Sequence, residues 1–126
     1  MNCLQLICAQ SVVTDKTTNQ VSVINIYETV IPPSIPFIIP AMALFAQFEK
    51  EESDPVELTF TLIIRLAGNL LYNQPIAISF IEPESKNNTT VNMQGLLINQ
   101  PGILSFNVEY AGEIKKNYLV NIFQKR

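Results

Sequence analysis

Alternation of apolar and polar side chains at every second residue most restricts how this chain can fold. It is clearest at residues 56–66, where the apolar set is Leu58, Phe60, Leu62, Ile64 and Leu66, and the polar set is Glu57, Thr59, Thr61 and Arg65. Successive side chains of a strand point to opposite faces, so this period predicts a strand with one buried face. The pattern recurs at residues 76–80, 103–110 and 114–122. We therefore expect an all-β protein.

Weaker strand patterns fill most of the remaining chain. They cover residues 4–9, 20–30 and 90–98, and turn sequences rich in Gly, Pro and Asn separate them from the other strands. In the second of these the apolar set changes phase between Val23 and Ile24, which is typical of a β-bulge. About eight or nine short strands at this spacing predict a two-sheet antiparallel β-sandwich with immunoglobulin-like, Greek-key connections. We expect residues 1–126 to form one such domain.

Two segments leave alternatives open. Residues 41–52 are rich in helix formers, which favours a helix, yet Met42, Leu44, Ala46 and Phe48 would share one face of a strand. We favour the strand, because the segment precedes residues 56–66 at hairpin distance. Residues 31–40 hold four prolines, which lack the N–H that a ladder needs. We expect them to be an extended crossover between the sheets and not a central strand.

The residue types exclude much catalytic chemistry. The chain has no histidine and no tryptophan, and its aspartates are Asp15 and Asp54 alone. Without an imidazole, neither a Ser-His-Asp or Cys-His nucleophile nor a zinc site with histidine ligands can be built. Paired carboxylates remain, such as Glu82 with Glu84, but they fall in turns or on polar strand faces where they stay solvated. We expect no enzyme activity, no cofactor and no metal site.

Charge and cysteine content restrict the partners and the compartment. A net charge of −3 gives no electrostatic reason to bind nucleic acid. No apolar run reaches the length of a membrane span, since the longest candidate, residues 31–48, contains four prolines. Cys3 and Cys8 fall about 16 Å apart on opposite faces of a regular strand, beyond disulfide reach, so we expect two free, buried thiols. Free thiols suit a reducing compartment and predict a cytoplasmic protein.

The order of these features resembles a known group of proteins. Ala9 and Val12, a polar turn, a β-rich stretch at 21–27, the proline run and a bare alternating strand resemble small uncharacterised bacterial proteins that share a domain of unknown function. The end of the chain, with Pro101-Gly102, an alternating strand and Gly112-Glu113, is similar to the last hairpin of many immunoglobulin-like sandwiches. The resemblance implies the sandwich fold and supplies no catalytic residue.

Apolar side chains on faces that should be wet are the best indication of function. They are Phe45, Ile63, Ile81, Leu119 and Phe123. On adjoining strands they would form an apolar patch that either loops or another subunit must cover. The leading hypothesis is a non-enzymatic sandwich that binds a second copy, as a homo-oligomer, or another protein, through an apolar sheet face or an edge strand.

Two further functional hypotheses remain. A carbohydrate or small-ligand module would use Asn and Gln side chains together with exposed Tyr27, Tyr72 or Tyr110, although the lack of tryptophan removes the usual aromatic platform. A carboxylate hydrolase would use pairs such as Glu82 with Glu84 or Glu109 with Glu113. Neither hypothesis names a substrate.

Overall fold

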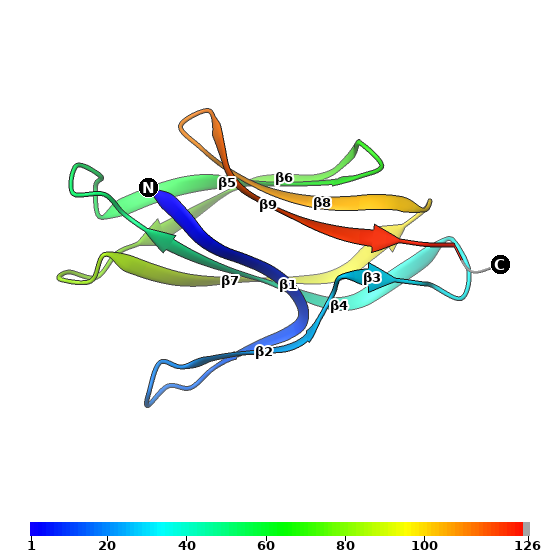
Figure 1. The fold of residues 1–126 in the computed structure, drawn as a ribbon, viewed down its shortest axis with the longest axis horizontal. Helices are drawn as coiled ribbons and strands as arrows, with labels where there is room; N and C mark the ends of the chain where they lie inside the picture. Colours follow the sequence, from blue (N-terminus) through cyan, green and yellow to red (C-terminus); the bar gives the residue numbers. More distant parts are fainter. Residues whose placement is uncertain (125–126) are drawn as a thin grey trace.

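A computed structural model, which describes residues 1–124, places nine strands of this part of the chain in two sheets (Figure 1). The strands are β1 (Asn2–Thr14), β2 (Val21–Ile26), β3 (Thr29–Val30), β4 (Phe37–Glu49), β5 (Glu57–Leu66), β6 (Asn69–Ser79), β7 (Lys86–Ile98), β8 (Gly102–Tyr110) and β9 (Glu113–Ile122). One sheet has the order β2-β1-β4-β7 and the other the order β3-β9-β8-β5-β6. The all-β, two-sheet prediction is confirmed, and residues 41–49 belong to β4, not to a helix.

The strand pairs are not all antiparallel. The short β3 pairs with β9 in parallel, through Thr29 with Asn121 and Val30 with Ile122, while the other pairs are antiparallel. The immunoglobulin-like topology stays a prediction. Within residues 1–124, no helix is long and apolar enough to cross a membrane.

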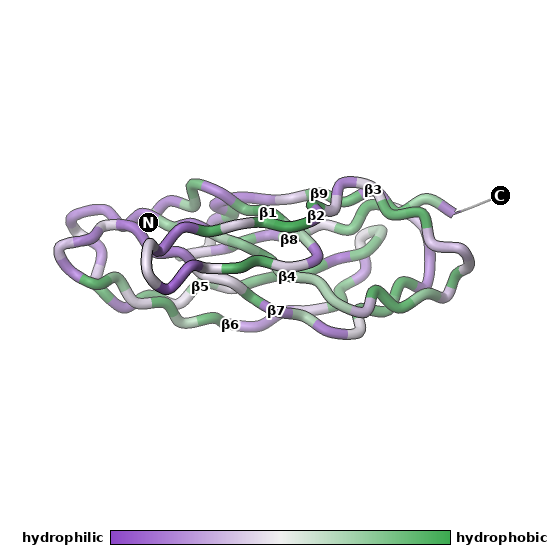
Figure 2. Tube along the Cα trace, turned by 90° about the horizontal axis from the view of Figure 1, so that it is seen from below, coloured by the Kyte–Doolittle hydropathy of each residue, from purple (hydrophilic) through white to green (hydrophobic). Residues whose placement is uncertain are grey.

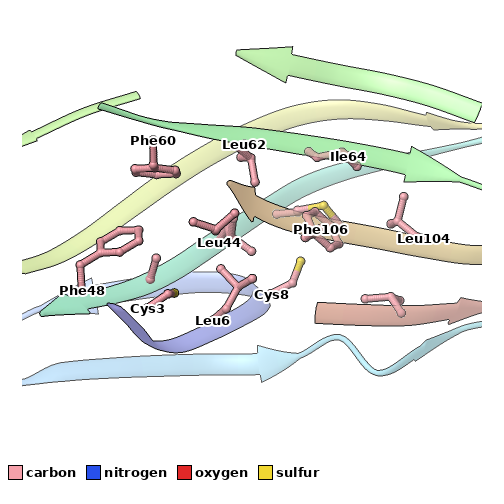
Figure 3. Packing of buried hydrophobic residues seen from close by; sticks show 14 of the residues in the cluster. Cys3, Leu6, Cys8, Leu44, Phe48, Phe60, Leu62, Ile64, Leu104 and Phe106 are labelled. Atoms are coloured by element: carbon pink, nitrogen blue, oxygen red, sulfur yellow. The ribbon is translucent and has the colours of Figure 1, made fainter. Parts of the chain in front are cut away.

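The alternating faces meet in one apolar cluster between the sheets, as predicted for β5 and β8 (Figure 3). Leu62, Ile64 and Phe106 are fully buried there, opposite side chains of the four-stranded sheet such as Leu44. The rings of Phe48 and Phe60 join the two sheets, with centroids 4.8 Å apart. Burial of apolar area on this scale is the main stabilising contribution to a sandwich of this size.

Both cysteines face this core, which corrects their expected placement on opposite faces. Cys3 pairs with Phe48 and Gln5 with Gln47, so β1 gains one extra residue at Leu4. This bulge reverses the phase of the strand and turns Cys3 and Cys8 to the same side. Both thiols are free and buried, as expected. Burial raises the pKa of Cys3 to about 11 and that of Cys8 to about 12.

The proline run is only partly a crossover. Residues 31–36 do connect the sheets outside any strand, but β4 begins at Phe37 and includes Pro40, contrary to the expectation that this segment avoids a central strand. The ladder to β7 passes from Ile39 to Ala41 and leaves Pro40 unpaired. On its other side β4 meets β1 only from Ala43 onward. Proline is tolerated because the ladder is interrupted at that residue and one-sided around it.

Residues 20–30 form two strands instead of one. β2 ends at Ile26 and β3 lies in the other sheet, while the β1–β2 register runs without a shift through Val23 and Ile24, so the expected bulge is absent there. Tyr27 is the point of transfer: its N–H donates to the Cys8 carbonyl at 2.8 Å, and its carbonyl accepts from the Tyr118 hydroxyl at 2.6 Å. Burial raises the pKa of Tyr118 above its ordinary value.

The second half of β1 and the whole of β2 form a hairpin that leaves the sandwich. In Figure 1 this hairpin lies beyond β4 and β7, on the side away from the five-stranded sheet. Its tip, which is hydrophilic in Figure 2, reaches the end of the molecule where the N-terminus lies. The turn is closed by Asp15, whose Oδ1 accepts the Thr17 N–H at 2.8 Å. The hairpin therefore brings residues 14–19 close to the β4 and β7 residues described below.

Candidate functional site

The five candidate interface residues do not form one patch. Phe45 lies on the outer face of β4 but is only 5% exposed, with Ile7 and Thr90 beside it on the neighbouring strands. Ile63 lies on the outer face of β5 and is only 6% exposed, between Asn73 and Asn107. Both side chains point away from the core, as expected, but both are buried. Neither is available to a partner.

The other three candidates are exposed but lie in two separate places. Ile81 is 79% exposed in the β6–β7 loop. Leu119 and Phe123 are 49% and 54% exposed and lie along the outer face of the β9 strand and its extension. Ile103 lies beside them, because its ladder partner Asn121 falls between the two. The apolar face therefore reduces to a small group, Ile103, Leu119 and Phe123, which we call the β9 face.

The sheet edges differ sharply in how they are protected. Edge strand β6 carries Pro75 and a bulge at Leu71, where the register to β5 shifts. Edge strand β2 has six residues, with Asn25 in a left-handed conformation. Because β3 has two residues, most of β9 also lies at an edge, where it has a bulge and two lysines. Edge strand β7 runs for 13 residues without a proline, and Lys86 is its only charged residue. Prolines, bulges, charges and short length are the usual protections of an edge, and most of β7 lacks them.

One backbone hydrogen bond shows which N–H and C=O groups of β7 point away from the sheet. The Lys50 N–H donates to the Ser85 carbonyl at 2.9 Å, one step beyond the Glu49–Lys86 pair, so Lys50 and Ser85 form a hydrogen-bonded pair. Such pairs alternate along an antiparallel ladder. The N–H and C=O groups of Asn87, Thr89, Val91 and Met93 therefore bind β4. Those of Lys86, Asn88, Thr90, Asn92 and Gln94 point away from the sheet.

An apolar hollow lies beside this open edge, between β7 and β6. It has a volume of about 230 Å³, and its lining includes Ile64, Leu71 and Tyr72 from one sheet and Met93 and Leu96 from the other. The inner-face residues Val91 and Met93 are half-buried and pack against the edge of the core. A strand added to β7 would place alternate side chains over this hollow.

A second, polar depression of about 560 Å³ lies between the tip of the β1–β2 hairpin and the outer face of the four-stranded sheet. Its lining is mostly amide and hydroxyl side chains: Thr14, Asn19, Gln47, Ser79, Asn87, Asn88 and Thr90, with Ile81, Glu84 and Lys86 beside them. The Gln47 side chain donates to Asn88 Oδ1 at 3.1 Å, and Asn87 Nδ2 donates to the Ser79 carbonyl at 2.8 Å. These bonds fix part of the lining and leave other amide groups open to a ligand.

The tyrosines considered for ligand binding are placed differently from the expectation. Tyr27, Tyr72 and Tyr110 are half-buried and pack against the core instead of standing exposed. The Tyr27 hydroxyl donates to the Ala41 carbonyl at 3.2 Å. Neither depression is lined by an exposed aromatic platform, although Tyr72 forms part of the wall of the apolar hollow.

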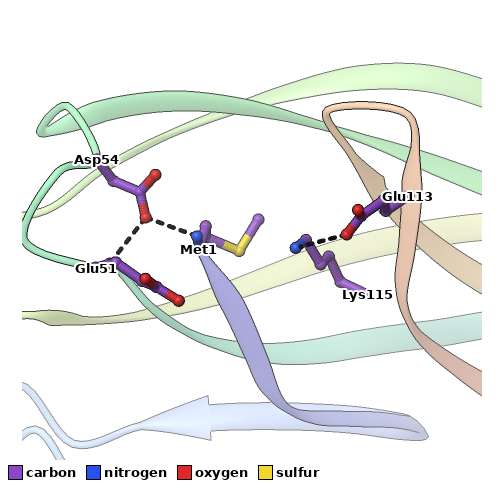
Figure 4. Close-up of polar contacts among 5 residues, drawn as sticks. All are labelled: Met1, Glu51, Asp54, Glu113 and Lys115. Atoms are coloured by element: carbon purple, nitrogen blue, oxygen red, sulfur yellow. Dashed lines mark hydrogen bonds and ion pairs between the residues drawn. The ribbon is translucent and has the colours of Figure 1, made fainter.

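The carboxylates of Asp54 and Glu113 are engaged in local structural contacts (Figure 4). Asp54 Oδ2 accepts the Glu51 N–H at 2.8 Å and lies 2.6 Å from the terminal amino group of Met1. These partners hold the pKa of Asp54 below its ordinary value. Glu113 pairs with Lys115 at 3.2 Å. Among residues 1–124, His, Cys, Asp and Glu side chains form no group of three that could hold a metal ion.

The sequence comparisons give a family and no activity. Residues 5–123 match a family of unknown function designated DUF6941. The chain belongs to this family. Its match includes the sandwich core, the β7 edge and the polar depression, so the candidate surfaces of this DUF6941 protein lie inside the matched region. No curated protein matches the chain significantly.

The open edge was not among the residues singled out from the sequence. A signal was present, since no charged residue and no proline falls between residues 87 and 98. The sequence alone does not show whether such a strand lies at the edge or in the centre of a sheet. The sheet order β2-β1-β4-β7 supplies that information.

Proposed function

We propose that this DUF6941 protein is a non-enzymatic binding module that takes up an extended segment of a protein chain at the β7 edge. In this mode the main-chain groups of the added strand supply affinity, and pockets for alternate side chains supply specificity. The observation that carries the proposal is the row of outward N–H and C=O groups on β7 beside the apolar hollow. We propose the cytoplasm as its location, because two free, buried thiols suit a reducing compartment.

Capture of partners from a lysate of the source organism tests the edge against the β9 face. The Asn92→Pro variant removes an outward N–H without touching the ladder to β4, and Leu119→Gln alters the β9 face. We expect proteins that bind the wild type to be lost with Asn92→Pro and kept with Leu119→Gln. The reverse result would move the binding surface to the β9 face. Capture that survives both substitutions would exclude both surfaces.

A second candidate function is supported by the polar depression. Its amide and hydroxyl lining suits a neutral, hydroxyl-rich ligand, such as a small carbohydrate, which amides bind through paired donors and acceptors. A thermal-shift screen of sugars and polar metabolites tests this function, with Asn88→Ala as the variant that removes one amide of the lining. A ligand that raises the Tm of the wild type but not of Asn88→Ala would support it. A screen without any shift would remove it.

A further inference from the structure

We infer that the strand taken up at β7 is β7 of a second copy, paired antiparallel so that the two four-stranded sheets become one continuous sheet. This inference rests on the proposed function and specifies the partner. Within residues 1–124 each chain has one long edge without protection: β6 has a proline and a bulge, β2 is short, and β9, which β3 pairs at two residues alone, has a bulge and the charges of Lys115 and Lys116. A surface that occurs once per chain and pairs with itself gives a closed twofold dimer, not a filament.

The charge distribution of the edge favours self-pairing. The outward groups from Asn88 to Gln94 belong to Asn, Thr and Gln residues, whose side chains are exposed on the outer face. Two copies can therefore meet without like charges facing each other, although each chain carries a net charge of −3. Across a ladder, amide and hydroxyl side chains can donate to and accept from their own kind.

The side chains on the inner face select the register. When Asn92 lies opposite Asn92 of the second copy, Val91 lies opposite Met93 of the second copy, and Met93 lies opposite its Val91. The half-buried apolar residues of β7 then cover one another beside the hollow. Lys86 falls opposite Ile98 of the second copy, at the end of the ladder and away from Lys86 of the second copy. A register centred on Thr90 would instead place Met93 opposite Asn87.

Analytical ultracentrifugation over a range of concentrations tests the dimer. We expect the wild type to form dimers and Asn92→Pro to weaken them at least about tenfold, because both copies lose the N–H at the centre of the ladder. Asn117→Lys, which adds a charge to an exposed position of β9 outside the β7 edge, is the control for surface change. The control should dimerise like the wild type.

Cysteine cross-linking tests the register. Directly opposite residues of a hydrogen-bonded pair have Cα atoms about 5.5 Å apart, within disulfide reach. Asn92→Cys should therefore give a covalent dimer on mild oxidation. Thr90→Cys should not, because the two Thr90 residues would be offset by four positions, or about 13 Å. The native Cys3 and Cys8 are buried and should stay out of the reaction.

The outcomes separate this inference from the proposed function. A wild type that is monomeric at every concentration, yet loses a captured partner on Asn92→Pro, overturns the second copy as occupant and leaves strand addition in place. A dimer that is unaffected by Asn92→Pro places the interface elsewhere and overturns the inference. A covalent dimer from Thr90→Cys in place of Asn92→Cys overturns the register.

Discussion

The assignment of inward and outward groups on β7 predicts that proline at two adjacent residues will change stability by very different amounts. Val91 forms a hydrogen-bonded pair with Leu44, so Val91→Pro removes an N–H that donates to β4. Asn92→Pro removes an N–H that points out of the sheet. Both positions have the extended backbone of a strand, and each preceding residue keeps a conformation that proline allows. The two variants therefore differ mainly in one ladder bond.

The magnitude follows from the surroundings of that bond. Losing an amide–carbonyl bond costs about 1 kcal/mol, and leaving a buried acceptor unpaired costs a further ~1–3 kcal/mol. Leu44 is 1% exposed, so its carbonyl cannot turn to water freely. We expect Val91→Pro to lower the free energy of unfolding by about 2–4 kcal/mol relative to Val91→Ala. The free energy of unfolding of Asn92→Pro should stay within about 1 kcal/mol of that of Asn92→Ala. Proline lowers the conformational entropy of the unfolded chain, and this gain offsets a small strain in the folded strand.

Urea unfolding followed by far-ultraviolet circular dichroism measures the difference. The protein should be dilute enough that any dimer has dissociated, since binding between copies would otherwise add to the apparent stability. The alanine variants remove the side-chain contribution at each position. If Asn92→Pro costs as much as Val91→Pro, or more, the alternation is reversed. The donors assigned to the edge would then bind β4, and strand addition at these groups would be refuted.

Three other predictions concern the core and the N-terminal contact. Phe48→Ala should lower the free energy of unfolding by about 3–5 kcal/mol in urea titrations, because Phe48 is fully buried against Phe60; a loss below about 1 kcal/mol would contradict this packing. Cys8 should react with a thiol reagent at pH 8 only after denaturation, since burial raises its pKa to about 12; fast labelling of folded protein would disprove its burial. Because the pKa of Asp54 is lower in the folded protein than its ordinary value of 3.8, the ionised carboxylate stabilises the fold at any pH above 3.8. This stabilisation is lost as the pH falls through the lowered pKa of the folded protein. The wild type should therefore have a higher Tm than Asp54→Asn at pH 6, and the two Tm values should converge in acid. A difference in Tm that is the same at both pH values would contradict the pairing of Asp54 with Met1.

The strands could be predicted where a single phase persists from end to end. In β5, Leu58, Phe60, Leu62, Ile64 and Leu66 are all buried, and in β8 Leu104, Phe106 and Val108 are buried in the same way. Both strands have a neighbour on each side in the middle of a sheet. Only one face of such a strand packs against the other sheet, so side-chain burial alternates every second residue, as the apolar residues of the sequence do.

Bulges of one residue explain most of the side chains whose direction, toward or away from the core, was predicted wrongly. The bulge at Leu4 turns Cys3 toward the core, and another at Lys115 turns Ile114 away from it, so Ile114 is exposed although Val120 on the same strand is buried. A bulge depends on the hydrogen bonds of two strands, whereas an alternation pattern describes one. The local sequence therefore contains the period but not the positions where it breaks.

The candidate interface was harder to predict because exposure depends on cross-strand neighbours. Phe45 and Ile63 face away from the core, as the alternation indicated, and are nevertheless covered. Their flanking residues, among them Ile7, Thr90 and Asn107, come from strands distant in sequence. Leu119 is exposed: the small Ser105 lies beside it on β8, and β3 pairs with β9 at Asn121 and Ile122 but not at Leu119. The alternation of apolar residues thus predicts to which face a side chain points, whereas the arrangement of the strands determines whether that side chain is exposed.

The bare edge of β7 needs an explanation because this chain has few other protections against association. Only 15% of its residues are charged, so electrostatic repulsion between copies is weak. The other edges carry protections, namely Pro75 in β6, the short length of β2, and the bulge and lysines of β9 beyond the two-residue β3. A long uncharged edge left open to solvent would recruit strands indiscriminately. A specific occupant removes that hazard, and pairing with a second copy removes it for both chains at once, since each covers the edge of the other.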